Sequence, residues 1–227
     1  MKVDLVICAP GSSFSAKNKI SFNRLLSTLH TFGVKGYMER NGSGSNVYDS
    51  RNICLSSLPY VHQMPFGDAG IDSYGHMLWI DSDQTFEPSD FGLLWEHRDI
   101  DIVSGWYRMK PGPGESFDEN NKTACGYLRR QGVDPRALTV GQIEKARGLI
   151  EVEYCGMGFM LIKQGVAESL EYPWFQGWVE KFTDDKGILC AEHISDDTGF
   201  MIRAQKAGFK IMVDPRVRVG HLKETEI

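Results

Sequence analysis

The chain has 227 residues, of which 41% are hydrophobic and 24% are charged, an ordinary composition for a globular protein. Length and composition exclude a mainly disordered, collagen-like or low-complexity protein. Twenty-five lysine and arginine residues stand against 30 aspartate and glutamate residues, which gives a net charge of −5. This balance argues against a nucleic-acid partner, because nucleic-acid binders concentrate basic residues on one surface.

The cysteine content favours a reduced protein. The number of cysteines is odd, and no two of them have the CxxC spacing, so neither a disulfide framework nor a structural zinc site is expected. No stretch approaches the ~20 apolar residues of a membrane-spanning helix, and the N-terminus lacks the pattern of a signal peptide. We therefore expect a cytoplasmic protein with free thiols and no integral membrane segment.

The first half of the sequence alternates predicted strands and helices. Short apolar runs that end at Gly, Pro or Asp predict strands, and apolar residues three or four positions apart predict helices. The predicted strands are 3–9, 35–40, 76–80 and 100–107, and the predicted helices are 18–31, 48–58 and 88–97. This alternation predicts an α/β fold with a mostly parallel central sheet flanked by helices.

The second half is less regular. Residues 110–148 contain Pro-Gly loops and one short predicted strand at 126–130. The remaining predicted strands are 150–154, 159–162, 210–213 and 217–221, and a helix is predicted at 196–207 with Gly208 as its C-cap. No boundary is sharp enough to divide the chain, so residues 1–227 are expected to form a single domain.

The motif Asp81-Ser82-Asp83 directly follows the predicted strand at 76–80. Residues two apart in an extended chain point the same way, so both carboxylates can face one point beyond the strand end. Ligands of open α/β sheets bind at this edge, and two convergent carboxylates suit Mn²⁺ or Mg²⁺. A polar turn before the next helix is the alternative without a function.

The same residues also match a different enzyme class. Four apolar residues followed by DxDxT are typical of phosphatases of the haloacid dehalogenase type, in which Asp81 would be the nucleophile. That motif usually lies near the N-terminus, and a later acidic pair should follow a hydrophobic strand. The segment before Asp196-Asp197 does not have the sequence of such a strand, so the phosphatase stays the alternative.

Taken together and in order, several segments resemble the GT-A fold glycosyltransferases that use nucleotide sugars, especially their small soluble bacterial, phage and large-virus members. The resemblance covers most of the chain except 110–148. It is carried by Cys8–Gly11, Asp49–Asn52, Tyr74–Phe86, Asp101–Tyr107, Glu153–Ile162, Asp196–Phe200, Val213–Pro215 and Val219–His221.

The resemblance implies a nucleotide and metal-binding half at 1–107 and an acceptor-binding half at 108–227. The implied contacts to the nucleotide sugar come from Ala9, Pro10, Gly11, Arg51, Asp81, Ser82, Asp83 and Lys223. The implied ligands of Mn²⁺ or Mg²⁺ are Asp83, His221 and Asp81. Arg51 also suits phosphate oxygens chemically, although a salt bridge on a helix surface would explain it equally well.

The acceptor side depends on the second acidic pair. In the resemblance Asp197 is the general base and Asp196 orients it or binds acceptor hydroxyls, although a plain helix N-cap would also place Asp there. The implied acceptor contacts are Gly156, Met157, Gly158 and Trp174, for which a tight turn and a core aromatic are the alternatives without a function.

We therefore expect a metal-dependent glycosyltransferase that moves a sugar from a nucleoside diphosphate sugar to a glycan or another hydroxyl acceptor. A UDP-linked donor and inversion at the anomeric carbon are favoured. Besides the phosphatase, a catalytically inactive carbohydrate-binding relative remains an alternative. A nucleotidyltransferase is excluded because the first loop, Pro10–Phe14, lacks the Arg and Lys of that class.

Overall fold

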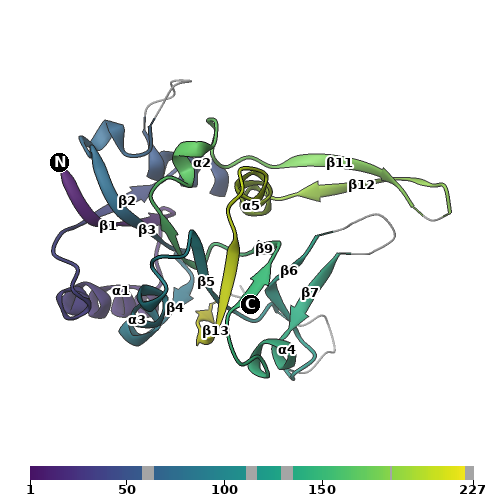
Figure 1. Ribbon diagram of the computed structural model, residues 1–227, viewed down its shortest axis with the longest axis horizontal. Coiled ribbons are helices and arrows are strands. Elements are labelled where there is room, and N and C mark those ends of the chain that lie inside the picture. The colour runs from purple at the N-terminus through teal and green to yellow at the C-terminus, as the bar shows by residue number, and fades with distance from the viewer. Residues whose placement is uncertain (58–63, 111–116, 129–134, 185, 223–227) are drawn as a thin grey trace.

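The computed structural model describes residues 1–57, 64–110, 117–128, 135–184 and 186–222. Within these residues, seven strands form a central sheet in the order β2-β1-β3-β10-β5-β13-β8 (Figure 1). Their bounds are β1 Lys2–Pro10, β2 Tyr37–Gly42, β3 Ser73–Ile80, β5 Ile102–Trp106, β8 Ile150–Val152, β10 Phe159–Lys163 and β13 Ile211–Arg218.

The predicted α/β class is confirmed, but the sheet is mixed and not mostly parallel. Strand β1 is parallel to β2 and β3, and β5 is parallel to β13. Strand β10 lies antiparallel between β3 and β5, and β8 is antiparallel to β13. The difference arises because β10 enters the sheet from a short reversal after Cys155 and not from a helical crossover, which a parallel neighbour would need.

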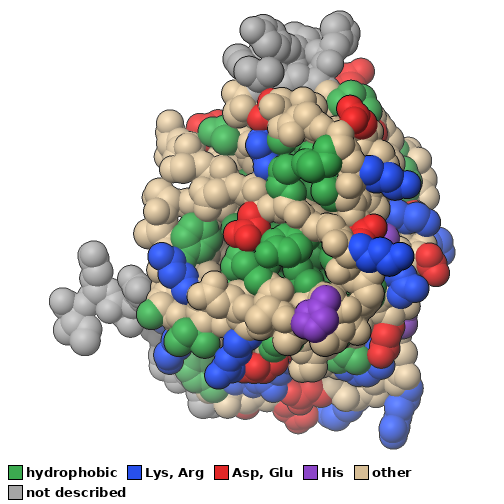
Figure 2. Space-filling view, turned by 90° about the vertical axis from the view of Figure 1, so that its left-hand side faces the viewer, with side chains coloured by type: hydrophobic (Ala, Val, Ile, Leu, Met, Phe, Trp, Pro, Cys, Tyr) green, Lys and Arg blue, Asp and Glu red, His purple; other side chains and the backbone are tan. Residues whose placement is uncertain are grey.

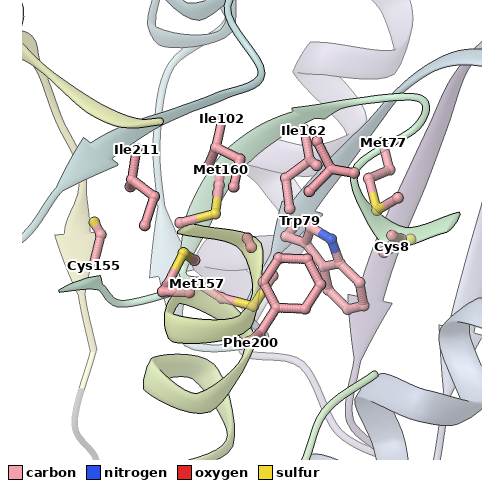
Figure 3. Packing of buried hydrophobic residues seen from close by; sticks show 14 of the residues in the cluster. Cys8, Met77, Trp79, Ile102, Cys155, Met157, Met160, Ile162, Phe200 and Ile211 are labelled. Atoms are coloured by element: carbon pink, nitrogen blue, oxygen red, sulfur yellow. The ribbon is translucent and has the colours of Figure 1, made fainter. Parts of the chain in front are cut away.

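Helices cover both faces of this sheet. The first face carries α1 (Ala16–Thr28) and α3 (Pro88–Glu96), and the second carries α2 (Val47–Leu55) and α5 (Asp196–Lys206) (Figure 1). Side chains of β3 alternate between the two layers, with Leu78 packed in the first and Trp79 in the second. Figure 3 shows Phe200 of α5 directed toward Trp79 across the second layer.

The helix boundaries follow local capping chemistry. Ser15 accepts a hydrogen bond from the Asn18 amide at the start of α1. The predicted helix 18–31 corresponds to α1 and a 3₁₀ turn (Leu29–Phe32), which ends at Gly33 with φ 80°. The helix predicted at 48–58 corresponds to α2, which ends earlier, at Leu55. Residue 58, the last of the predicted range, lies outside the described part of the chain.

Strand β13 passes through the point at which the sequence predicts a break. Asp214-Pro215 lies inside it, and the pairing with β5 shifts register between Val213 and Arg218. Proline has no amide hydrogen to donate, so it is accommodated at such an irregularity. The carboxylate of Asp214 accepts hydrogen bonds from the backbone and side chain of Arg216 and stabilises this segment.

The segment 110–148 has more structure than its sequence predicts. It contains β6 (Lys122–Tyr127), β7 (Arg136–Thr139) and α4 (Val140–Glu144). Thr139 and Gln142 form a reciprocal capping box at the start of α4, a signal that the sequence analysis overlooked. Part of the predicted strand 126–130 lies outside the described residues.

Smaller elements complete the fold. Strands β11 (Trp178–Thr183) and β12 (Leu189–Ile194) form a hairpin that projects from the body (Figure 1), which the sequence analysis did not predict. Further pairs are β4 (Gln84–Thr85) with β14 (Gly220–His221) and β9 (Tyr154–Cys155) with β6. Two 3₁₀ turns lie at Gly67–Ala69 and Ala167–Ser169.

Two surface properties bear on function. Among the described residues, no helix combines the length and the apolar character needed to cross a bilayer.

Figure 2 shows one face of the molecule, on which basic and acidic side chains are interspersed around hydrophobic ones. This face therefore has no extended area of a single charge.

Asn52 joins α2 to the segment before β11 and provides a test of the packing. Its buried side-chain amide donates to the Phe175 carbonyl at 2.7 Å and accepts from the Phe175 amide at 3.0 Å. Asn52→Ala should lower the free energy of unfolding by about 3 kcal/mol, because two buried backbone groups lose their partner. Urea unfolding measures the loss, and exposed Asn41→Ala should change stability by less than about 0.5 kcal/mol.

Candidate active site

The carboxyl ends of β1 and β3 lie side by side at one edge of the sheet. Their parallel register aligns Cys8 with Trp79, so the loop after Pro10 lies beside the turn after Ile80. Gly11 has φ 126°, and a Cβ there would lie 3.3 Å from the Ser82 Oγ. Glycine is therefore needed where these two loops meet.

The turn Asp81-Ser82-Asp83 is held by backbone contacts. The buried Asn18 side chain of α1 donates to the carbonyls of Asp81 at 3.1 Å and Gln84 at 2.9 Å. The Asp81 amide donates to the Gly158 carbonyl at 3.0 Å. The orientation of the motif is thus fixed from two sides, by a helix start and by the loop before β10.

Arg51 of α2 joins two carboxylates from distant parts of the chain. Its Nη1 lies 2.7 Å from Asp196 Oδ2, and its Nη2 lies 3.1 Å from Asp81 Oδ2. The Arg51 side chain is only 5% exposed, so the alternative of a salt bridge on a helix surface does not describe it, and its ion pairs lie inside the protein. The guanidinium joins the end of β3 to the start of α5 inside the protein.

Burial shapes the electrostatics of this ion-pair group. Burial alone would lower the pKa of Arg51, but the charges of Asp81 and Asp196 outweigh it and raise the pKa above its usual value. For Asp81 burial is the largest influence and raises the pKa, with Arg51 opposing it in part and Asp83 adding to it. Arg51 therefore favours the charged form of Asp81 against the effect of burial.

Asp83 pairs with His221 from the far end of the chain. Strand β14 lies against β4 so that His221 aligns with Gln84, and the Leu222 amide donates to the Asp83 carbonyl at 2.8 Å. His221 Nε2 lies 2.9 Å from Asp83 Oδ2. Burial would raise the pKa of Asp83, but the hydrogen bond and charge of His221 outweigh it and lower the pKa.

The donor chemistry at this pair fits a divalent cation in part. Asp83 and His221 supply one carboxylate and one imidazole, both of which Mn²⁺ accepts, and the Asp83 side chain is 41% exposed. Asp81 is directed to Arg51, so the structure brings together two of the three predicted ligands. Within the described residues, no group of three or more His, Cys, Asp and Glu residues is placed to hold a metal ion.

Asp197 faces an open cleft, whereas its neighbour Asp196 does not. The cleft has a volume of about 760 Å³ and is lined by β6, the loop after β5 and the start of α5, including Asp197. The Asp197 carboxylate accepts hydrogen bonds from the Ser195 hydroxyl and from the Thr198 amide, the latter at 2.7 Å. Asp196 is 8% exposed and is bound by Arg51.

The predicted acceptor contacts divide between backbone and core. Gly156 lines the cleft, and a Cβ there would clash with the Tyr107 hydroxyl; one on Gly158 would lie 2.7 Å from Gln84 Nε2. The Met157 side chain is fully buried in the core beneath them (Figure 3).

Trp174 is a core aromatic, which was the alternative to the predicted acceptor contact. Its side chain is fully buried, as is that of Phe175, which packs between Trp79 and Phe200. The segment 174–175 lies in the interior because Phe175 contacts both α2, through Asn52, and α5, through Phe200.

Other predicted contacts lie at the sheet edge or outside the described residues. Ala9 and Pro10 are buried at the end of β1, so their side chains face the interior. Gly11 and Ser82 lie together beyond them. Lys223, a predicted nucleotide contact, lies outside the described residues.

Sequence reasoning missed several residues that shape the site. Asn18 and Gln84 have no local signal, because their partners are distant in sequence. Tyr107 packs against His221 with ring centroids 4.8 Å apart, a contact between the middle of the chain and its C-terminal region. Ser195 could have been found from the sequence, since a serine immediately before a predicted helix is a common N-cap residue.

Neither a protein-family model nor a curated protein matches the sequence. Among solved structures, the crystal structure of A197 from STIV is similar to this chain, with a TM-score of 0.53 and 16% sequence identity. The match covers 98% of this chain and 95% of that one. At this level of identity the likeness bears on the fold alone.

The ion pairs of Arg51 predict a large effect of its removal. Arg51→Gln should lower the free energy of unfolding by about 3–5 kcal/mol, because the buried carboxylate of Asp196 and the half-buried one of Asp81 lose their counter-charge. The double variant Arg51→Gln/Asp196→Asn should regain part of that loss, since one uncompensated charge is gone. Urea unfolding at neutral pH measures both.

A matched control separates burial from charge. Arg24 pairs with Glu87 at 3.1 Å, but both side chains are more than half exposed. Arg24→Gln should cost less than about 1 kcal/mol. Equal losses in Arg24→Gln and Arg51→Gln would contradict the assignment of a buried ion-pair group.

Proposed function

We propose that the chain is a GT-A fold glycosyltransferase that transfers a sugar from a nucleoside diphosphate sugar, with UDP favoured, to a hydroxyl of a glycan or another acceptor. One observation carries the proposal. Arg51 ties the strand end that bears the Asp81–Asp83 turn to the helix start that bears Asp196 and Asp197. Carboxylates suited to a donor cation and to proton transfer thus lie around one sheet edge.

The donor would lie over the ends of β1 and β3. Asp83 and His221 would hold Mn²⁺ or Mg²⁺, which when bound neutralises charge on a diphosphate leaving group. The backbone from Ala9 to Gly11 and the Ser82 hydroxyl would line the nucleotide side. Asp81 would anchor Arg51 between β3 and α5 without itself attacking phosphorus.

Asp197 is proposed as the general base. The acceptor hydroxyl gives its proton to this carboxylate as its oxygen bonds to the anomeric carbon, and the bond from that carbon to the diphosphate oxygen breaks. Attack from the face opposite the leaving group inverts the anomeric centre. The exposure of Asp197 to the cleft supports this choice over Asp196, which Arg51 engages.

The contacts of Asp81 and Asp83 also bear on the two alternatives, the phosphatase and the inactive relative. In a phosphatase of the haloacid dehalogenase type Asp81 would attack phosphorus, but here the Arg51 guanidinium binds its carboxylate. The segment before Asp196 is a strand, β12, but it belongs to the projecting hairpin and its residues alternate in exposure. An inactive carbohydrate-binding relative would not need the Asp83–His221 pair.

Removal of Asp83 tests the cation site. Asp83→Ala should remove the Mn²⁺-dependent part of UDP binding, because His221 alone offers one ligand. A thermal-shift titration of UDP with and without Mn²⁺ measures it, since a ligand of the folded state raises the melting temperature. Asp90→Ala, on α3, is the control and should retain the Mn²⁺-dependent shift.

Two outcomes would count against this cation site and the transferase. Undiminished Mn²⁺-dependent UDP binding in Asp83→Ala would remove the proposed ligand. Phosphate trapped on Asp81 after incubation with an aryl phosphate, seen as added mass, would favour the phosphatase.

Asparagine replacements separate the two carboxylates at the start of α5. Asp197→Asn should reduce turnover ~10²–10⁴-fold with little change in UDP affinity, because the amide cannot accept the acceptor proton. Its side-chain oxygen can still accept from the Thr198 amide, so folding should survive. Asp196→Asn should act mainly on stability through Arg51. Full loss of turnover in a folded Asp196→Asn, with Asp197→Asn active, would reverse the assignment.

A further inference from the structure

We propose that the acceptor is an anionic sugar, whose phosphate or carboxylate binds Lys110 and Lys122 in the cleft that Asp197 also lines. The inference rests on the proposed transferase function and names the acceptor class for the same site. Both lysines and Asp197 line the cleft of about 760 Å³.

The backbone holds the two lysines together. The Met109 amide donates to the Lys122 carbonyl at 2.9 Å, which places Lys110 beside the start of β6. Lys122, Thr123 and Ala124 of β6 all line the cleft, and of these three residues Lys122 is exposed whereas Thr123 is buried. Lys122 therefore stands on a strand of the cleft wall and not on a loose surface loop.

The second observation concerns the ion pairs of these lysines. In the described part of the chain neither Lys110 nor Lys122 forms an ion pair, whereas Lys145 and Lys210 each lie 3.1 Å from a glutamate. On the face in Figure 2, basic and acidic side chains are interspersed. Two ammonium groups without an ion-pair partner in the same cleft, in a protein of net charge −5, favour an anionic ligand.

The spacing along the cleft suits a sugar. Lys122 and Ala124 are two residues apart on an extended strand, a separation of about 7 Å between their Cα atoms. The Ala124 carbonyl accepts from the Gly156 amide at 2.9 Å, and Gly156 also lines the cleft with Asp197. The cleft that Lys122 lines thus also contains Gly156 and Asp197, so we place the anionic group at Lys122 and a hydroxyl of the same sugar at Asp197.

The remaining lining supports the same ligand class. Asn120, Tyr154 and Thr198 add polar groups for sugar hydroxyls, and Met109 with Ala137 adds apolar area for a ring face. Lysine binds phosphate or carboxylate as a point charge, so either group fits this wall. Only the experiment separates the two.

The test measures ligand affinity in the presence of saturating UDP and Mn²⁺, so that the diphosphate site is filled. The probes are glucose 6-phosphate, glucuronic acid and glucose. The proteins are the wild type, Lys110→Gln/Lys122→Gln, and Lys35→Gln as an exposed lysine on the loop before β2. We expect at least one anionic sugar to bind about tenfold more tightly than glucose, and the double variant to lose that preference.

The outcomes distinguish the acceptor inference from the proposed function. Glucose binding and UDP binding should be unchanged in the double variant, and Lys35→Gln should match the wild type. Preference for the phosphate sugar or for the uronic acid identifies the anionic group. Equal affinity for neutral and anionic sugars, or an anionic preference that survives in the double variant, would overturn the inference. A wild type that does not bind UDP would instead contradict the transferase itself.

Discussion

The buried ion pairs of Arg51 are the interaction on which the site depends. One guanidinium lies between carboxylates that are 115 positions apart in sequence, Asp81 and Asp196, and it is almost fully excluded from water. Buried charges are costly unless paired and hydrogen-bonded, so the end of β3 and the start of α5 can hardly separate without exposing charge. The energetic cost of leaving these charges unpaired therefore keeps the end of β3 and the start of α5 next to each other.

This constraint works because the flanking elements are rigid. Strand β3 is central in the sheet, and its side chains fill a core on each face. Helix α2 is tied to the Phe175 segment through Asn52, and the turn after β3 is held by Asn18. Arg51 therefore connects parts that are each fixed independently, which is what a pre-organised proposed active site requires.

The central elements could be predicted because their signals are local. The apolar run before Asp81 predicts a buried strand, and the helical spacing before Gly33 predicts a helix that ends there; both are confirmed. The direction of β10 could not be predicted, since an apolar strand reads alike in either direction. The burial of Trp174 depends on rings brought in from β3 and α5, so no short window of sequence contains it.

The site was predicted unevenly for the same physical reason. The Asp81–Asp83 turn and the Asp196–Asp197 pair stand out as motifs, but their partners lie far along the chain. The pairing of Asp83 with His221 requires β14 to lie beside β4, and these two strands are far apart in sequence. Arg51 was predicted from its chemistry toward phosphate, while its position between two carboxylates became apparent only in the fold.

The adjacent carboxylates at the start of α5 show how one residue of spacing separates two roles. Successive side chains on a helix point about 100° apart, so neighbours cannot share an environment. Asp196 turns inward to Arg51, and Asp197 turns outward to the cleft, where the Ser195 hydroxyl and Thr198 amide hold it. The inner carboxylate fixes the rotation of the helix about its axis, and that rotation aims the outer one. An acidic pair at this place therefore joins a structural anchor to the proposed general base, and a single aspartate could not occupy both positions.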